Sequence, residues 1–527
     1  MDSHNEAPAA AMMRAAANRC MWVLAGACIM CAFVLAGTAG AIDLYDGRIV
    51  IHGKWSNQLL MRAHDIQDYE LYDYRIFNAR TSLKLEAMAY MYDGPEYSVN
   101  LYSVWKQFYD GAHRLDSGYK HYLEWGSNGG TSGIDQLNYY HQLKDISREL
   151  FLEFNAPLFQ VRLGKQIVSW GETGFERMVD NINPVDARGN LNPAYPDFAE
   201  IKRGLWMARL FFTPMDQPMD LSYELLVIPD FEPNRQWPAG YHLSHPKAAN
   251  PFPFFDQQYR ALYRDAPQDD WSKPEFGIRI RGFLAGFDWT LSCFHHRNDD
   301  GVLKPNKGME VFAGMLGLVH LEDVYRYPWM ETFGFTLNKP IDATIPIIPG
   351  TTLAMAGSIF RLESVWEHGK PAAETVGDPR MMQSRITEQD RYAVCLAWQT
   401  KIFLPYITPW ARNKYLASTT QLFYETMPAR SRNDQYFPWV TYAPKRHHWT
   451  VITEELGYEL WNGRILPGFY GVYYTNEAGG YWAPALGFKP QFKHTFMVRY
   501  LDYFGLGDSP ANLNHKDFWT FEYTYEF

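Results

Sequence analysis

The C-terminal stretch Asp517–Phe527, which reads DFWTFEYTYEF, decides the fold class. Its aromatic residues are Trp519, Phe521, Tyr523, Tyr525 and Phe527, and Thr520, Glu522, Thr524 and Glu526 lie between them. In an extended strand this period of two places all the aromatic side chains on one face and the polar ones on the other. Such a face would promote aggregation at the edge of a sheet in water. It is stable where hydrocarbon covers it, as on the outside of a transmembrane barrel.

The same period recurs along the chain, for example in Ser82–Met91, Phe276–Arg281 and Phe333–Leu337. Asn462-Gly463 is a strong two-residue hairpin signal between two aromatic-rich runs. We therefore predict an all-β fold, a transmembrane antiparallel barrel with an even number of strands, about 14 to 18. The alternative for the terminal strand is a soluble β-sandwich in which it packs on its own sheet.

Charged residues stand in the middle of several of these strands, opposite apolar neighbours. On a lipid-facing surface each basic residue would cost roughly 2–4 kcal/mol at mid-depth. We therefore expect them to face a wet lumen, although the water-facing surface of a soluble sheet would explain them equally well. The lumen candidates are Lys84, Glu86, Arg162, Arg279, Arg281, Arg361 and Glu363.

The N-terminus is typical of a secretory signal peptide. Two arginines precede the apolar stretch Met21–Leu35, and small residues at 39–41 offer a cleavage site. We expect residues 1–41 to be removed and residues 42–527 to form the barrel in the outer membrane of a Gram-negative bacterium; a retained anchor helix is the alternative. The formal net charge of -10 argues against a nucleic-acid partner.

Long and short connections alternate along the chain. Segments 171–204, 229–271 and 297–329 are long, whereas the turn at 285–288 is short. Barrels of this class have short periplasmic turns and long external loops, so we expect the long segments outside or folded into the mouth. When strands are counted back from Phe527, which should lie at the periplasmic end, the long segments fall on the periplasmic side instead. One strand is therefore missed or added in the count, and we place the error between Tyr406 and Gln491.

Two motifs are distinctive: Arg162–Arg188, with RLGKQIVSWGE and NINPVDAR, and Leu226–Arg235, LVIPDFEPNR. In both, the sequence resembles a family of Gram-negative outer-membrane proteins catalogued as domain of unknown function thirteen-oh-two. Lys165 departs from the Arg usual there, which keeps the charge and loses the forked guanidinium. The resemblance covers most of the mature chain and brings no established activity.

The resemblance implies an outer-membrane barrel in contact with outer-membrane lipids and lipopolysaccharide. The chain's ending, with Phe after an alternating strand, also resembles the signal read by the barrel assembly machinery. Family members are often encoded near exporters of the resistance-nodulation-division class and a periplasmic lipoprotein-like protein. The resemblance therefore implies such an exporter or lipoprotein as a partner.

Both motifs end in loops on the same predicted rim. Gly171 allows a sharp turn after the strand, and Asn183-Pro184 followed by Asp186 is turn chemistry. We expect the two loops to pack together as an inward-folded constriction, cross-linked by their charged residues; the alternative is a purely structural link to the wall. The loop candidates are Trp170, Glu172, Asn183, Asp186, Arg188, Asp230, Glu232 and Arg235.

The sequence contains no G-x-S-x-G elbow, H-E-x-x-H helix or phosphate-binding loop. We therefore predict no enzyme, no metal site and no cofactor. The leading interpretation is a channel or gated conduit for small molecules, hydrophobic ones included. The alternatives are a non-catalytic scaffold that docks a periplasmic exporter arm or cytochrome, and an outer-membrane lipid hydrolase.

Overall fold

The computed structural model describes residues 41–63, 74–126, 134, 143–188, 198–215, 219–235, 271–303, 325–347, 354–375, 384–404, 415–427, 436–437, 448–476, 478–505 and 516–527. The expected signal peptide falls almost wholly outside the described residues. Among the described helices, none has the length and apolar character needed to cross a membrane.

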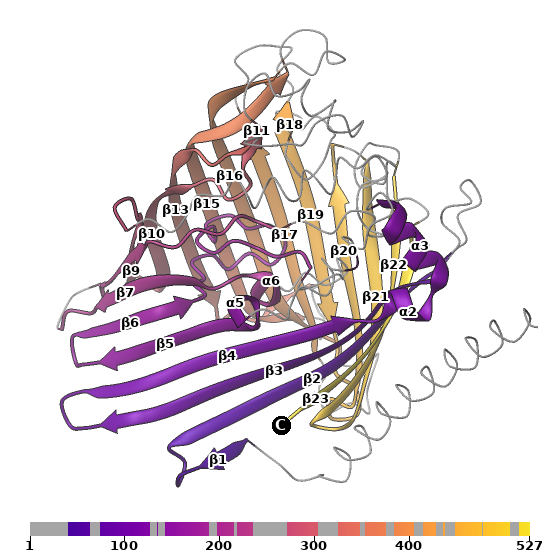
Figure 1. Ribbon diagram of the computed structural model, residues 1–527, viewed down its shortest axis with the longest axis horizontal. Helices are drawn as coiled ribbons and strands as arrows, with labels where there is room; N and C mark the ends of the chain where they lie inside the picture. The colour runs from indigo at the N-terminus through magenta and orange to yellow at the C-terminus, as the bar shows by residue number, and fades with distance from the viewer. Residues whose placement is uncertain are drawn as a thin grey trace, which may run out of the picture.

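A closed barrel of 18 antiparallel strands makes up most of the described chain (Figure 1). Each strand pairs with the next along the chain, and the last pairs with the first. The barrel strands are β2 (Ile49–Arg62), β3 (Ile76–Asp93), β4 (Ser98–Asp110), β5 (Ser147–Asn155), β6 (Phe159–Gln166), β7 (Leu205–Phe212), β8 (Ser222–Ile228), β9 (Glu275–Leu284), β10 (Phe287–Arg297), β13 (Trp329–Ile341), β15 (Ala354–Thr375), β16 (Ser384–Phe403), β17 (Tyr415–Thr426), β19 (His448–Gly457), β20 (Ile465–Tyr474), β21 (Gly479–Gln491), β22 (His494–Phe504) and β23 (Phe518–Glu526). The predicted fold class and strand range are confirmed.

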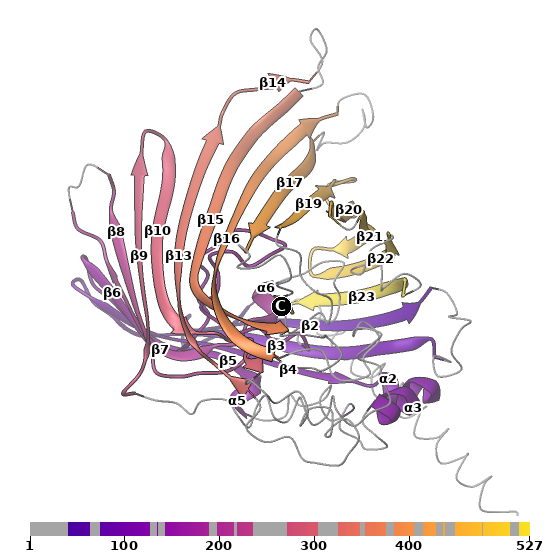
Figure 2. The ribbon, with the colours of Figure 1, turned by 90° about the horizontal axis from the view of Figure 1, so that it is seen from above.

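Short elements accompany the barrel. The short strands are β1 (Ile42–Leu44), β11 (Val302–Leu303), β12 (Tyr325–Arg326), β14 (Ile345–Pro346) and β18 (Tyr436–Phe437). The helices are α2 (Ala112–Leu115), α3 (Ser117–Gly126), α5 (Leu143–Ile146) and α6 (Phe198–Ile201). Viewed from above, α6 lies inside the ring of strands, whereas α2 and α3 lie beyond the end of β4 (Figure 2).

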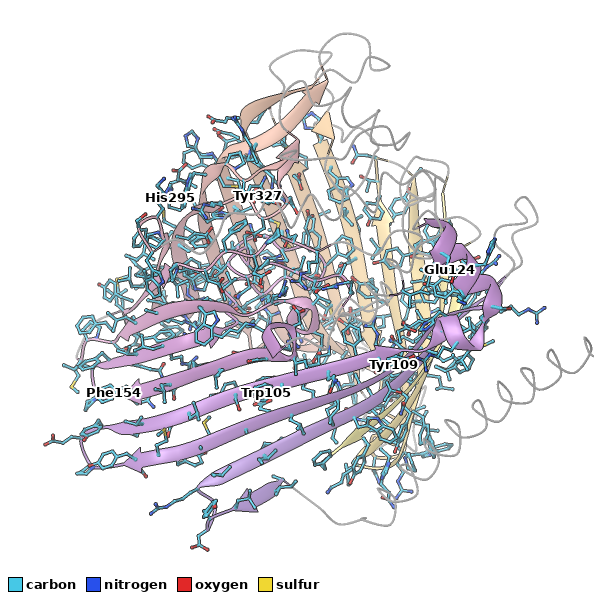
Figure 3. The ribbon with its side chains drawn as sticks, in the orientation of Figure 1. Trp105, Tyr109, Glu124, Phe154, His295 and Tyr327 are labelled. Atoms are coloured by element: carbon cyan, nitrogen blue, oxygen red, sulfur yellow. The ribbon has the colours of Figure 1, made fainter. Side chains whose placement is uncertain are left out.

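The two faces of the strands differ as the sequence pattern predicts. On β9, Phe276 and Ile278 are each 47% exposed, whereas Glu275 and Arg279 on the other face are buried. Side chains stand on both faces of the wall, as Figure 3 shows. An exposed apolar belt opposed by buried charge is stable only with hydrocarbon outside the barrel.

The lengths of the loops show which end of the barrel is external and which is periplasmic. The loops that follow β6, β8 and β10 are long and lie at the end opposite Phe527, and the turn between β9 and β10 is only Ala285-Gly286. Four strands, β17, β19, β20 and β21, occupy the region where the sequence count failed. When these four strands are counted, the long loops and Phe527 lie at opposite ends of the barrel. The inconsistency in the strand count made from the sequence is thereby removed.

Strand β23 closes the barrel against β2. The pairing runs from Lys54 opposite Glu526 to Arg62 opposite Phe518. Beyond it, the Phe527 amide donates to the Gly53 carbonyl at 2.9 Å, and the Gly53 amide donates to the Phe527 carbonyl at 2.8 Å. The Phe527 ring lies where a Cβ at position 53 would be, so glycine is required there.

The closing contact generates a test. Gly53→Ala should collide with the Phe527 ring and cost about 1–3 kcal/mol, as overpacking does. Phe527→Ala removes the obstacle, so the double variant should be less impaired than the sum of the two single variants. The measurement is the folded fraction in detergent refolding, read as a heat-modifiable band on a gel. If the losses of the two single variants added up in the double variant, the contact between Gly53 and Phe527 would be contradicted.

Candidate functional site

The connection between β6 and β7, residues 167–204, is named the inner loop; the structure describes 167–188 and 198–204 of it. Its contacts reach β3 and β4 on one side and β15, β16 and β20 on the other. One segment can touch all these strands only from inside the barrel, because their outer face is the apolar belt. The inner loop therefore lies across the lumen.

Trp170 fixes the beginning of the inner loop against the wall. Its indole NH donates to the Glu224 carboxylate of β8 at 3.2 Å, and its ring meets Phe294 of β10 edge-on at 6.3 Å. The Arg279 guanidinium lies over the same ring, 5.5 Å from its centroid. The tryptophan of the first motif thus sits in a buried polar and aromatic socket rather than at an exposed rim.

Glu363 of β15 holds the next part of the inner loop. Its carboxylate accepts hydrogen bonds from the backbone amides of Glu172 at 3.0 Å and Val179 at 2.9 Å. A Cβ at Gly171 would stand 2.5 Å from this carboxylate, so glycine permits the approach. The Glu172 side chain pairs with Arg361 of β15 at 3.2 Å and accepts from Asn338 of β13 at 2.9 Å.

Arg391 of β16 makes a second attachment. This buried guanidinium pairs with Glu176 of the inner loop at 3.3 Å, and with Glu367 at 3.2 Å and Glu425 at 2.9 Å on the wall. Next to Glu176, the Phe175 ring lies 5.7 Å from Phe423 of β17 and 6.2 Å from Tyr474 of β20. The tip of the inner loop therefore rests on the wall far from β6.

The inner loop returns past the first strands of the barrel. Glu200 of α6 pairs with Lys106 of β4 at 2.5 Å, Arg148 of β5 at 3.3 Å and Lys84 of β3 at 3.4 Å. Burial raises the pKa of Glu200, but the three cations outweigh burial and hold its pKa well below the usual range. The glutamate is therefore ionised at any physiological pH.

A second set of charges joins the inner loop to the loop after β8. Asp186 accepts both arms of Arg188, at 2.8 and 2.6 Å, and Arg235 lies 3.7 Å from it. Backbone hydrogen bonds also link Arg235 to Val185 and Ala187 at 2.8 Å. We name as the rim cluster Asp145, Asp186, Arg188, Arg203, Glu232 and Arg235, which the ion pairs connect.

Asp186 titrates abnormally because of these neighbours. Burial raises its pKa, but the guanidinium groups of Arg188, Arg235 and Arg203 outweigh burial and bring it well below the usual range. The side chains of two other loop candidates form hydrogen bonds with backbone groups. Asn183 bridges Val168, Gln166 and Arg203 through its amide group, at 2.7, 3.0 and 2.8 Å. Asp230 accepts from the Trp206 amide at 2.8 Å.

The structure thus divides the loop candidates predicted from sequence between two places. Asp186, Arg188, Glu232 and Arg235 meet in the rim cluster. Glu172 does not join them, because its carboxylate binds Arg361 and Asn338 on the opposite wall. The cross-link we expected from all the charged motif residues is therefore two separate attachments.

The lumen candidates lie on the buried or charge-bearing face of their strands. Lys84 and Glu363 bind the inner loop, and Arg361 binds Glu172 on it. The other four make wall contacts or stay exposed. Arg162 pairs with Glu153 at 2.7 Å, Arg279 with Glu224 at 2.7 Å, Glu86 accepts from Tyr102 at 2.7 Å, and Arg281 is exposed.

Sequence reasoning missed several residues of equal weight. Glu224 and Arg209 of the wall, which pair at 2.5 Å, and Arg391 are mid-strand charges of the kind already used as a criterion. Applying that criterion to every strand would have found them. Asp145 and Glu200 lie in short helices whose position carries no periodic signal. In the described part of the chain, no three His, Cys, Asp or Glu side chains are grouped to hold a metal ion.

The chain matches a known protein family in sequence. The model of a family described as protein of unknown function (DUF1302) matches residues 67–383, which include both motifs and the inner loop. No curated protein matches the chain.

Solved barrels also resemble it. Acinetobacter baumannii OccAB1 has a TM-score of 0.47 and 8% identity, covering 93% of this chain and 99% of its own. Pseudomonas aeruginosa OpdK with vanillate has a TM-score of 0.43 and 8% identity, covering 91% and 98%. A BenF-like porin from Pseudomonas fluorescens Pf-5 has a TM-score of 0.43 and 9% identity, covering 91% and 98%.

Glu363→Gln tests the attachment to β15. A neutral acceptor forms weaker hydrogen bonds than a carboxylate, so amide exchange at Glu172 and Val179 should accelerate by about tenfold or more. The measurement is hydrogen exchange of the refolded protein in detergent. Glu153→Gln, which alters an ion pair between wall strands, is the matched control and should leave these amides unchanged. Equal exchange in all three proteins would refute the attachment.

The rim cluster predicts a pH dependence. An aspartate with a depressed folded pKa stabilises the folded state above its unfolded pKa of about 3.9, and this contribution is lost as pH falls through the folded pKa. Asp186→Asn should therefore open the segment around Val185 at pH 7. The difference between the variant and the parent should shrink below about pH 4. Segment-resolved hydrogen exchange at both pH values measures it, and a difference that grows on acidification would contradict the assignment.

Proposed function

The chain belongs to the DUF1302 family of proteins of unknown function, and we propose that it is an outer-membrane channel for small apolar molecules, gated by the inner loop. The observation that carries the proposal is the attachment of one loop to both sides of the lumen. The attachments are ion pairs and hydrogen bonds at Glu200, Glu363 and Arg391. Such contacts break and re-form without covalent change, which a gate requires.

The residues of the wall beneath the inner loop support the proposal that the solute is apolar. From β16 to β22 many inward residues are small or apolar, although Arg391, Gln421 and Glu425 also face inward there. The small and apolar inward residues are Ala393, Cys395, Ala397, Phe423, Val451, Val472, Tyr481, Ala483 and Leu501. These side chains form one apolar cluster with Trp170, Met178, Val179 and Ile182 of the inner loop.

The apolar wall has a consequence for selectivity. A water-filled pore is lined by polar groups, whereas this part of the lumen would present an apolar patch beside the ion pairs of Arg391 once the inner loop moved away. On β3, β4 and β5 the basic side chains would lose their partner Glu200, whereas pairs within the wall, such as Arg279 with Glu224, would remain. Displacement of the inner loop would therefore open a passage with one apolar side, which favours apolar or amphipathic solutes over ions.

A non-catalytic scaffold that docks a periplasmic partner is the second candidate. A lumen crossed by its own loop favours it as much as it favours a gate. A scaffold would also need a broad periplasmic surface, yet the described turns at 94–97, 285–286 and 492–493 are short. The exporter or lipoprotein partner that the family resemblance implies stays a prediction.

Loosening the inner loop distinguishes the two functions. The double variant Glu176→Gln with Glu363→Gln weakens the contacts to β15 and β16 without leaving a buried cation unpaired, because Arg391 keeps Glu367 and Glu425. Uptake of an apolar dye into liposomes should rise by roughly tenfold over the parent, as the loss of about 1.4 kcal/mol of closure predicts, and planar-bilayer conductance should rise by less.

Glu153→Gln serves as the control and should behave as the parent. Uptake that rises more than ion conductance would support the apolar passage. Absence of conductance and uptake in the parent and in the double variant would reject the channel and leave the scaffold.

A further inference from the structure

Two surfaces of the inner loop hold it in the lumen, and they differ in chemistry. At α6, the Glu200 carboxylate binds basic side chains of β3, β4 and β5. Nearer its middle, the inner loop packs Val179 against the wall at Gly334 of β13. A solute that takes the place of the inner loop therefore meets a basic surface and an apolar one.

The place of the Glu200 side chain is built for a carboxylate. Its Oε2 atom binds Lys106 Nζ at 2.5 Å and Arg148 Nη1 at 3.3 Å, and its Oε1 atom binds Lys84 Nζ at 3.4 Å. Lys84 and Lys106 stand directly opposite each other on β3 and β4. Like charges in such a pair repel, so the pair is stable only with an anion beside it.

The inner loop supplies all the partners that these cations have in the described part of the chain. Lys84 and Lys106 bind only Glu200, and Arg148 also donates to the carbonyls of residues 199 and 202 of the same segment. Lys106 and Arg148 are buried. Movement of α6 away from the wall would leave buried cations unpaired, which is strongly unfavourable unless another anion replaces Glu200.

The nearby carboxylates of the wall do not provide that anion. Glu86 of β3 accepts a hydrogen bond from the Tyr102 hydroxyl at 2.7 Å, and Glu149 of β5 accepts one from the Ile167 amide at 3.3 Å. Neither carboxylate forms an ion pair with a described residue. The replacement must therefore come from outside the wall.

The space beside Glu200 is closed while α6 is in place. A cavity of about 20 Å³ lies there, and five of its lining side chains are basic whereas two are acidic. This volume holds about one water molecule and no solute. A carboxylate from solution therefore reaches the cations by displacing Glu200 and not by binding beside it.

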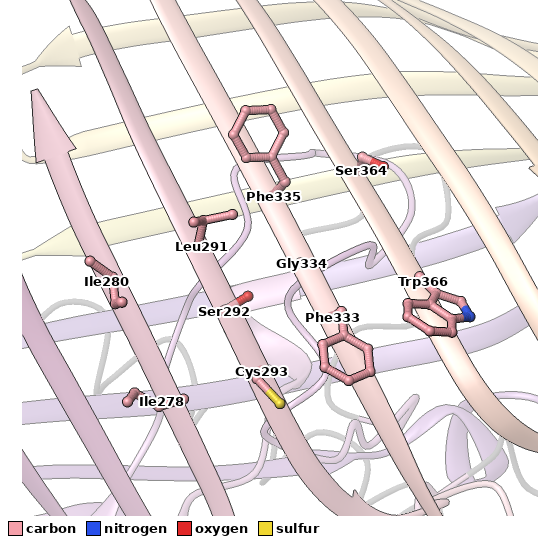
Figure 4. Close-up of a pocket in the computed structure, with 10 residues that line it drawn as sticks. All are labelled: Ile278, Ile280, Leu291, Ser292, Cys293, Phe333, Gly334, Phe335, Ser364 and Trp366. Atoms are coloured by element: carbon pink, nitrogen blue, oxygen red, sulfur yellow. The ribbon is translucent and has the colours of Figure 1, made fainter. Parts of the chain in front are cut away.

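The second surface is apolar and is joined to the first. Gly334, labelled on β13 in Figure 4, has no side chain, and Val179 fills the space on its inner side, where a Cβ at position 334 would collide with it. Asp180 follows Val179 in the chain and pairs with Lys202, two residues beyond Glu200. The ion pair links the two surfaces, so displacement of α6 also loosens Val179.

We propose that the solute is an amphipathic carboxylate, whose charged group displaces Glu200 from its three cations while its apolar part takes the place of Val179. This inference rests on the proposed function, because it names the class of solute that the channel carries. A neutral apolar molecule has no group to replace Glu200, and a small carboxylate has none to replace Val179. Release of the inner loop is therefore coupled to a solute that carries both groups.

Hydrogen exchange of the full chain, refolded in detergent, tests the coupling. The amides of Glu172 and Val179 report release of the inner loop, because both donate to Glu363 of the wall. The probes are octanoate, octan-1-ol and acetate, which carry the tail and the charge, the tail alone and the charge alone. At neutral pH, saturating octanoate should accelerate exchange at both amides by roughly tenfold.

The other two probes serve as controls. Octan-1-ol should have no effect, and acetate should need a concentration at least roughly tenfold higher, because it buries no tail. An equal response to octanoate and octan-1-ol, or no response to octanoate, would overturn the proposal.

Glu200→Gln separates displacement from general loosening. The variant removes the internal carboxylate and keeps the three cations, so the dissociation constant of labelled octanoate should fall by roughly tenfold. Equilibrium dialysis, with excess unlabelled octanoate as the background, measures it. Addition of Lys106→Gln should reverse the gain, whereas addition of Lys339→Gln should not, because Lys339 is an exposed lysine that donates to the Ala285 carbonyl.

Glu200→Asp, which shortens the internal carboxylate, repeats the test if Glu200→Gln gives no heat-modifiable folded band. Both experiments measure binding and release without a need for flux. Absence of flux would therefore reject the channel, whereas an octanoate affinity that is the same in the parent and in the folded Glu200 variant would reject this class of solute.

Discussion

Backbone amides and carbonyls have no partner in hydrocarbon, so a chain that crosses a membrane as strands must close its sheet on itself. Here the pairing of β23 with β2, extended by the hydrogen bonds between Gly53 and Phe527, completes that closure. Closure gives every strand an inner and an outer face. At the depth of the hydrocarbon the outer face must then be apolar, and charged side chains stand on the inner face or near the membrane interfaces.

Charged side chains buried inside the barrel must in turn be paired, because an isolated buried ion is far more costly than a paired one. The inner loop supplies many of the partners. Glu200 neutralises cations of the first strands, and Glu176 shares Arg391 with two wall carboxylates. The same contacts that pair the buried charges therefore also hold the inner loop across the lumen.

Strand periodicity allowed the fold class, the outward aromatic face of β23 and the strand range to be predicted from the sequence. The hairpin around Asn462-Gly463 was also predicted, but its loop is longer than the two residues expected, because Leu460 pairs with Ile465 and Trp461 also has a positive φ. Partners inside the barrel were not readable. Glu172 and Arg361 lie far apart in the sequence and six strands apart around the barrel, and a period of two says which face a residue occupies but not what crosses the lumen to meet it.

The central claim is that the inner loop rests on the far wall and closes the lumen there. Gly174 of the inner loop would place a Cβ 3.7 Å from the Gln421 side chain of β17. In a protein whose native Cys293 and Cys395 are replaced by serine, Gly174→Cys and Gln421→Cys can be joined by a short reducible bismaleimide-type reagent in membranes. We expect an internally cross-linked protein that carries no solute flux until the cross-link is cleaved. Free labelling of both thiols without cross-linking would contradict it.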